Sequence, residues 1–149
     1  MIESEDRPSV ILGGDHAELD RLWEVFQAIP DSDCSARRLA FDAYQKELMQ
    51  HMRVEEELLF PRLIGPDPAL TSLARRLLEE HVEIRQSLDG IDHFLTTGEG
   101  SMDSAGMALI NVLWEHNARE EAQAYPWFDQ HLSIEDAREV RRRMTLKPP

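Results

Sequence analysis

The sequence predicts an all-α protein, an up-down-up-down four-helix bundle made of two repeated helical hairpins and followed by a short C-terminal helix. Apolar residues recur in steps of three and four along four long segments, and no stretch alternates as a β-strand does. Clusters of Gly, Pro and Asp separate these segments. An internal repeat of 65 residues relates the first two segments to the last two.

The first hairpin is expected to contain two helices. The first helix covers residues 15–29, where Asp15 is placed to cap the start and Pro30 to end the helix. The second helix covers residues 35–63. Its inward stripe alternates steps of three and four residues: Phe41, Tyr44, Leu48, His51, Glu55 and Leu58. A histidine and a glutamate thus stand where core residues are expected.

The second hairpin repeats this plan. Its helices are expected over residues 68–95, with Asp67 as N-cap, and over residues 103–130. The segment Ser133-Ile134-Glu135-Asp136 has the form of a capping box, which indicates one more short helix ending near residue 144.

The chain is therefore divided into three parts. Residues 1–14 contain Pro8 and a Gly-Gly pair, and we expect an irregular leader there. Residues 15–131 form the four-helix bundle, and residues 132–149 hold the short C-terminal helix and a tail.

Composition excludes several classes of function. The 149 residues suffice for one domain with a substantial core. Since 29 acidic and 16 basic residues give a net charge of −13, nucleic acid and anionic membranes would be repelled. No apolar run reaches the roughly 18–20 residues of a membrane span, and the acidic N-terminus lacks the features of a secretion signal. The single cysteine excludes an internal disulfide. We expect a cytoplasmic protein.

A repeated motif dominates the chain: a His, a Glu four residues later, and a closing aromatic-Pro pair. It occupies residues 51–61 and again residues 116–126. Another histidine, His16 or His81, lies 35 residues before each copy. Residues i and i+4 share one helix face, so each copy presents an imidazole and a carboxylate together. Counting back from the connecting loops at about 1.5 Å per residue places all four histidines in one layer.

This layer would bury six polar side chains: His16, His51, Glu55, His81, His116 and Glu120. A lone histidine on an apolar stripe is often a hydrogen-bonded core residue. Two buried carboxylates are different, because each is costly unless it is paired. Two divalent metal ions would remove this cost, with imidazoles as ligands and carboxylates as bridges. Nitrogen and oxygen donors favour iron or manganese, with zinc as an alternative.

On these residues the chain resembles the hemerythrin-like (HHE cation-binding) family, over roughly residues 10–131. The resemblance implies a four-helix bundle that holds a non-heme di-iron centre. His16 and His51 would bind one iron, and His81 and His116 the other. Glu55 and Glu120 would bridge the two ions.

One position departs from the oxygen carriers of this family, which place another histidine four residues after the one on the third helix. Here the residue is Arg85, and its repeat mate is Asp20. Arginine stays protonated and cannot ligate, so no more than four histidines are available. Arg85 is expected to donate a hydrogen bond to a group that supports the ligands, to pair with Asp20 or Glu120 near the site, or to face solvent. Two further carboxylates, Glu56 and Glu121, are expected to face solvent, and the alternative is that one fills a vacant coordination position.

The leading hypothesis is a di-iron protein that binds oxygen, nitric oxide or peroxide, or that senses or handles iron. The alternatives are an enzyme that removes peroxide or nitric oxide, and an iron donor for the repair of iron centres. A bundle with a structural metal such as zinc is the simplest competitor. A small diatomic molecule or peroxide is the expected partner. Neither nucleic acid nor membrane is expected, and a homodimer through an exposed helix face is compatible with the sequence.

Overall fold

The computed structural model describes residues 2–146. Seven α-helices are present in this range: α1 (Pro8–Ala28), α2 (Cys34–Val54), α3 (Phe60–Leu63), α4 (Pro68–Thr97), α5 (Met102–Arg119), α6 (Tyr125–His131) and α7 (Ile134–Thr145). Two π-helical turns, η2 (Glu55–Leu59) and η3 (Glu120–Ala124), join α2 to α3 and α5 to α6 without a break. No β-strand occurs within residues 2–146. The predicted four-helix bundle with a short terminal helix is confirmed.

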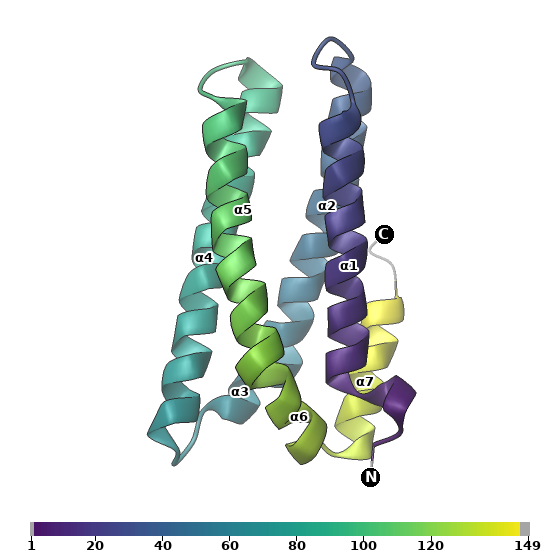
Figure 1. Ribbon diagram of the computed structural model, residues 1–149, viewed down its shortest axis with the longest axis vertical. Helices are drawn as coiled ribbons and strands as arrows, with labels where there is room; N and C mark the ends of the chain where they lie inside the picture. The colour runs from purple at the N-terminus through teal and green to yellow at the C-terminus, as the bar shows by residue number, and fades with distance from the viewer. Residues whose placement is uncertain (1, 147–149) are drawn as a thin grey trace.

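Two antiparallel hairpins make up the bundle (Figure 1). One pairs α1 with α2, and the other pairs α4 with α5. The hairpins meet through α1 with α6, α3 with α4, and α2 with α4. In Figure 1 their ribbons lie close in the lower half and diverge toward the two connecting loops. The lower half is therefore where side chains from all four long helices can meet.

The first helix begins earlier than the sequence predicts. Residues 8–14 are helical, so the expected irregular leader is wrong over that stretch. Pro8 occupies the first helical turn, where a residue without an N–H costs nothing. The two interior glycines disfavour helix by roughly 1 kcal/mol each. Tertiary contacts offset this: Leu12 is fully buried, and Ser9 N–H donates to Asp129 Oδ1 at 3.0 Å.

Local signals fix most other helix starts. The N-cap side chains of Asp33, Asp67, Ser101 and Ser133 each accept a hydrogen bond from a backbone N–H in the first turn that follows. Helix α4 ends at Gly98, whose φ of 73° lies in the left-handed region. These caps are the reason that the predicted boundaries of these helices agree closely with the structure.

Apolar residues form two core clusters, one on each side of a polar layer. The cluster toward the connecting loops includes Trp23, Phe41 and Leu88, and the cluster at the other end includes Val54 and Phe128. Helix α7 covers the second cluster at α1 and α2, where its Val140 is fully buried. The polar layer lies where the two hairpins meet.

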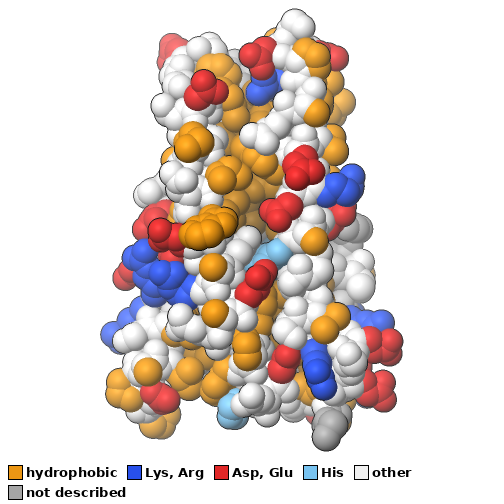
Figure 2. Space-filling view, in the orientation of Figure 1, with side chains coloured by type: hydrophobic (Ala, Val, Ile, Leu, Met, Phe, Trp, Pro, Cys, Tyr) orange, Lys and Arg blue, Asp and Glu red, His pale blue; other side chains and the backbone are white. Residues whose placement is uncertain are grey.

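A furrow separates the hairpins at the loop end. Apolar side chains line its floor in Figure 2. Its volume is about 840 Å³, and its apolar lining includes Trp23, Phe26, Phe94, Leu95 and Ile110. No helix among the described residues is long and apolar enough to cross a membrane.

Candidate metal centre

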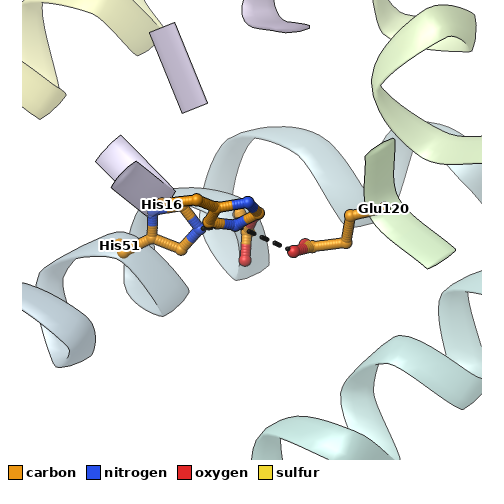
Figure 3. Close-up of side chains that lie close together, drawn as sticks. His16, His51 and Glu120 are labelled. Carbon is orange, nitrogen blue, oxygen red and sulfur yellow. Dashed lines mark hydrogen bonds and ion pairs between the residues drawn. The ribbon is translucent and has the colours of Figure 1, made fainter. Parts of the chain in front are cut away.

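Six polar side chains form the layer between the two core clusters, as the repeat predicts. Four long helices and the two π-helical turns supply them: His16 (α1), His51 (α2), Glu55 (η2), His81 (α4), His116 (α5) and Glu120 (η3). Each exposes 5% or less of its surface. Figure 3 shows the imidazoles of His16 and His51 together, with Glu120 reaching toward them from the other hairpin.

The first group of donor atoms comes from His16, His51, Glu55 and Glu120. The Nε2 atoms of His16 and His51 lie 3.1 Å apart. Glu55 Oε1 lies 3.0 Å from His51 Nε2, and Glu120 Oε1 lies 3.3 Å from His16 Nε2. All four donors lie within 4.8 Å of one another, which is compact enough for one ion.

The second group shares both carboxylates with the first. It consists of Glu55, His81, His116 and Glu120. The two Nε2 atoms lie 3.2 Å apart, Glu55 Oε2 lies 3.1 Å from His81 Nε2, and Glu120 Oε1 lies 3.1 Å from His116 Nε2. The structure thus places two four-donor groups side by side, with Glu55 and Glu120 common to both.

A π-helical turn begins at each glutamate of the layer and leads into the proline that closes each motif. Pro61 and Pro126 have no N–H and would clash with the carbonyl four residues back in a regular helix. A wider turn accommodates them, since Phe60 N–H donates to the Glu55 carbonyl and Tyr125 N–H to the Glu120 carbonyl, five residues back. The helical periodicity of apolar residues in the sequence does not distinguish such a turn from a regular helix. The proline at the same place in both repeats is the signal that could have found it.

Four further carboxylates surround the histidines, each bonded to one Nδ1. Asp15 lies 2.7 Å from His51 Nδ1, and Glu80 lies 3.3 Å from His116 Nδ1, within each hairpin. The other pairs run between the hairpins: Glu121 to His16 Nδ1 at 2.9 Å and Glu56 to His81 Nδ1 at 2.7 Å.

These outer carboxylates correct two expectations. Glu56 and Glu121 were expected to face solvent. Glu121 does, with 54% of its side chain exposed, whereas Glu56 is partly buried, and each also binds an imidazole across the hairpin interface. Neither belongs to a four-donor group, so the alternative of direct ligation is not supported by the geometry. Asp15 does not cap a helix, because it lies inside α1. All four follow the 65-residue repeat, which the sequence contained as Asp15/Glu80 and Glu56/Glu121.

The hydrogen bonds at Nδ1 determine what faces the centre. A carboxylate accepts only, so each Nδ1 carries the proton, and in the neutral imidazole Nε2 is left with a lone pair. Facing lone pairs at 3.1 and 3.2 Å repel unless a cation lies between or beside them. The inner carboxylates add negative charge, and Glu120 Oε2 is buried with no hydrogen bond. Glu55 Oε2 likewise lacks one, despite its short distance to His81.

The pKa values also indicate that the layer favours positive charge, because the carboxylates stabilise protonated histidines. Burial opposes the charged form of His51, but Glu55 and Asp15 outweigh it and raise the pKa of His51 well above the usual value. The pKa of His116 is raised to about 10, where Glu120 overcomes the effect of burial. The pKa of Glu55 is lowered for the reciprocal reason, against burial and because of His51. In the absence of metal, protons would fill the role of the cation.

Arg85 pairs with neither Asp20 nor Glu120, but it takes the supporting role that was also expected. Its Nη1 lies 2.8 Å from Glu56 Oε1, so it supports the carboxylate that binds His81. Although burial opposes the charge, hydrogen bonds from His81 and Arg85 lower the pKa of Glu56 to about 2. In the other repeat Asp20 replaces the arginine. Burial raises the pKa of Asp20 against the effect of His16, and the charges of Glu24 and Glu121 raise it further. The two halves of the centre therefore differ in charge.

Tyr125 is the residue that the sequence analysis missed. Its hydroxyl donates to Glu55 Oε1 at 2.7 Å and lies 3.1 Å from Glu120 Oε1 and from His16 Nε2. Its repeat mate is Phe60, which packs against the His81 ring at 5.1 Å. The difference between Tyr-Pro and Phe-Pro at the ends of the two motifs was the available signal.

A small cavity adjoins the layer on the side of the connecting loops. Its volume is about 10 Å³, enough for about one water-sized molecule. Three histidines of the layer line it, and its apolar lining consists of Leu19, Tyr44, Leu48, Met52, Ile84 and Leu113. Tyr44 is a core residue as expected, buried and packed against Trp23 with ring centroids 5.2 Å apart.

A four-helix bundle with this inward layer of imidazoles and carboxylates defines a cation-binding protein of the helical-bundle class. The family model described as the Hemerythrin HHE cation binding domain matches residues 7–128, and the chain belongs to that family. Neither the curated proteins nor the solved structures searched gave a match.

Proposed function

We propose that this protein is a non-heme di-iron protein that binds oxygen, nitric oxide or peroxide. Six side chains would hold the two ions: His16 and His51 for one, His81 and His116 for the other, and Glu55 and Glu120 as bridges. The observation that carries this proposal is the pair of four-donor groups with two carboxylates in common. The buried oxygen of Glu120, which has no hydrogen bond, and the facing Nε2 atoms are what two cations would satisfy.

The donor set favours iron. Imidazole and carboxylate without thiolate suit iron and manganese, whereas a structural zinc site is closed by four ligands in a tetrahedron. Two groups that share carboxylates suit ions with more than four coordination positions. Bound iron would supply the affinity for a small diatomic molecule or peroxide. We propose that manganese and zinc are weaker competitors.

The chain itself would select small, uncharged ligands. The cavity beside the layer has room for about one water-sized molecule, and apart from its histidines, Asp20 and Asn117 its lining is apolar. Trp23 lines the furrow between the hairpins and packs on Tyr44, which lines the cavity. An apolar molecule would move from the furrow to the cavity past Trp23 and Tyr44 more readily than an ion would. We propose a cytoplasmic protein with no nucleic-acid partner, because of its charge of −13.

A second candidate is an enzyme that removes peroxide or nitric oxide. Four protein donors at each ion leave positions for a substrate, and that observation favours turnover. Consumption of hydrogen peroxide by the iron-loaded protein would favour the enzyme over the protein that only binds its ligand. An iron donor would instead lose iron readily to a chelator.

The first experiment counts metals. The protein is purified without oxygen, its metals are measured by mass spectrometry, and oxygen is then admitted while the visible spectrum is recorded. About two irons per chain, with a new absorption on oxidation, are expected. A His16→Ala/His116→Ala double variant should lose the metal, and a His93→Ala variant, altered at an exposed histidine outside the layer, should keep it. Stoichiometric zinc, or less than one iron, would contradict the proposal.

A further inference from the structure

We infer that Tyr125 is a fifth protein ligand of the ion held by His16 and His51, which makes the two ions of the centre inequivalent. The inference rests on the proposed di-iron function. It adds a tyrosine to the four histidines and two glutamates that are proposed as ligands. Its basis is the position of one buried oxygen atom relative to four donor atoms.

The hydroxyl of Tyr125 touches every member of the first donor group. It lies 2.7 Å from Glu55 Oε1, 3.1 Å from Glu120 Oε1, 3.1 Å from His16 Nε2 and 3.5 Å from His51 Nε2. Neighbouring ligands of an octahedral ion, at about 2.1 Å from the metal, are about 3 Å apart. Tyr125 Oη therefore has the spacing of a coordinating atom that neighbours all four donors.

The distances between consecutive donor atoms also match the spacing of neighbouring ligands around one ion. His16 and His51 are 3.1 Å apart, His51 and Glu55 are 3.0 Å apart, and His16 and Glu120 are 3.3 Å apart. The five atoms resemble a square pyramid, in which the four donor atoms form the base and Tyr125 Oη is the apex. The proposed ligation breaks the O–H bond, forms an oxygen–metal bond and sends the proton to solvent, with no change in oxidation state.

The second donor group lacks an equivalent atom. The repeat places Phe60 where Tyr125 stands, and its ring packs against His81 without offering an oxygen. Every other member of the layer obeys the repeat, including the glutamates and both π-helical turns. Besides Arg85 and Asp20, which lie outside the donor groups, the Tyr125 hydroxyl is the difference between the two halves, and it alone of the three contacts the donor atoms.

Tyr125 approaches from the side opposite to the cavity. It follows Glu120 toward the end of the bundle that α6 and α7 close, whereas Leu19, Leu48 and Leu113 line the cavity toward the connecting loops. At the first ion Tyr125 would occupy the far side and leave the cavity side to a small ligand.

The test uses the two tyrosines of the chain, Tyr44 and Tyr125. Wild type, Tyr125→Phe and Tyr44→Phe are loaded with iron(II) without oxygen, oxidised, and examined by metal counting and resonance Raman spectroscopy with ring-deuterated tyrosine. Wild type and Tyr44→Phe are expected to show phenolate–iron(III) bands that shift on deuteration, because Tyr125 is the only tyrosine left in Tyr44→Phe. Tyr125→Phe should lose these bands while it keeps about two irons.

The outcomes separate the two proposals. Wild type with about two irons and no phenolate bands would overturn the ligation by Tyr125 and leave the di-iron function standing. Bands that vanish in Tyr44→Phe would also overturn it, by assigning them to the other tyrosine. Less than one iron in wild type would overturn both. Should Tyr125→Phe fail to fold, the Tyr44→Phe spectrum decides alone.

Discussion

Glu55 and Glu120 are the two residues that both donor groups share, while each histidine belongs to one group. Removal of a carboxylate charge should therefore affect both ions, and removal of one histidine should affect one. We expect Glu120→Gln to lower the iron content from about two per chain to well below one, and His81→Ala to leave about one. Metal counting after anaerobic loading measures this. Two irons retained by Glu120→Gln would contradict the bridging role.

Glu56 acts through another residue, since it binds His81 Nδ1 at 2.7 Å and carries the ion pair with Arg85. Carboxylates that orient a metal-binding histidine typically affect metal affinity by about 10–100-fold. We expect Glu56→Gln to weaken iron binding by about that factor, measured by competition with a chelator. Glu57→Gln is the matched control, because Glu57 pairs with Arg143 on α7 and not with the layer. Equal loss in both variants would show a general effect of surface charge.

At this scale the sequence predicted the histidines and glutamates but not their surroundings. The 65-residue repeat and the i, i+4 spacing were enough to place the six inner side chains together. The bond from Glu56 to His81 joins the two hairpins, and no local pattern encodes a contact of that kind. The Tyr125 hydroxyl contacts the layer because its side chain points toward Glu55 and Glu120, and residue spacing alone does not predict that direction.

At the scale of the elements, the helices were predictable and their irregular turns were not. Caps such as Asp67 and Ser133 are local signals, and they predicted helix starts closely. The start of α1 was missed because the two glycines looked like breakers, while tertiary packing of Leu12 keeps that segment helical. Each π-helical turn begins at a glutamate of the layer and accommodates the proline that follows.

Two glycines of α4 should respond oppositely to alanine. Gly98 ends the helix with φ of 73°, a conformation that costs a residue with Cβ about 1 kcal/mol. Gly90 lies inside the helix, and an added Cβ would meet Ala105 Cβ at 3.7 Å, an ordinary contact. We expect Gly98→Ala to lower the free energy of unfolding by about 1 kcal/mol and Gly90→Ala to raise it by about 0.5 kcal/mol. Urea denaturation of each variant checks both signs, and a gain in Gly98→Ala would contradict the left-handed cap.

At the scale of the whole molecule, the polar layer makes stability depend on pH and metal. The pKa of His116 is raised in the folded state, to about 10 from an ordinary 6.5. A group of this kind stabilises the metal-free fold fully below its unfolded pKa, and the contribution is lost as the pH rises through the folded pKa.

The metal-free protein should therefore lose thermal stability between about pH 6.5 and about pH 10. Metal displaces these protons, so apparent affinity should rise about tenfold per pH unit for each proton released. The loaded protein should depend less steeply on pH over the same range. Circular dichroism melting curves of both forms measure this, with His116→Gln expected to flatten the metal-free profile. Equal slopes in the two forms would mean that protons and metal do not compete for the layer.

The repeat also sets how the chain could be divided. Each donor group takes three residues from one hairpin and one carboxylate from the other, and the bonds of Glu56 and Glu121 cross in the same manner. Residues 2–66 and residues 67–146, produced as two separate polypeptides, would each carry an incomplete centre. Iron would then act as the agent of assembly, and reconstitution of the pair should require it. A chelator would return the two halves to free chains.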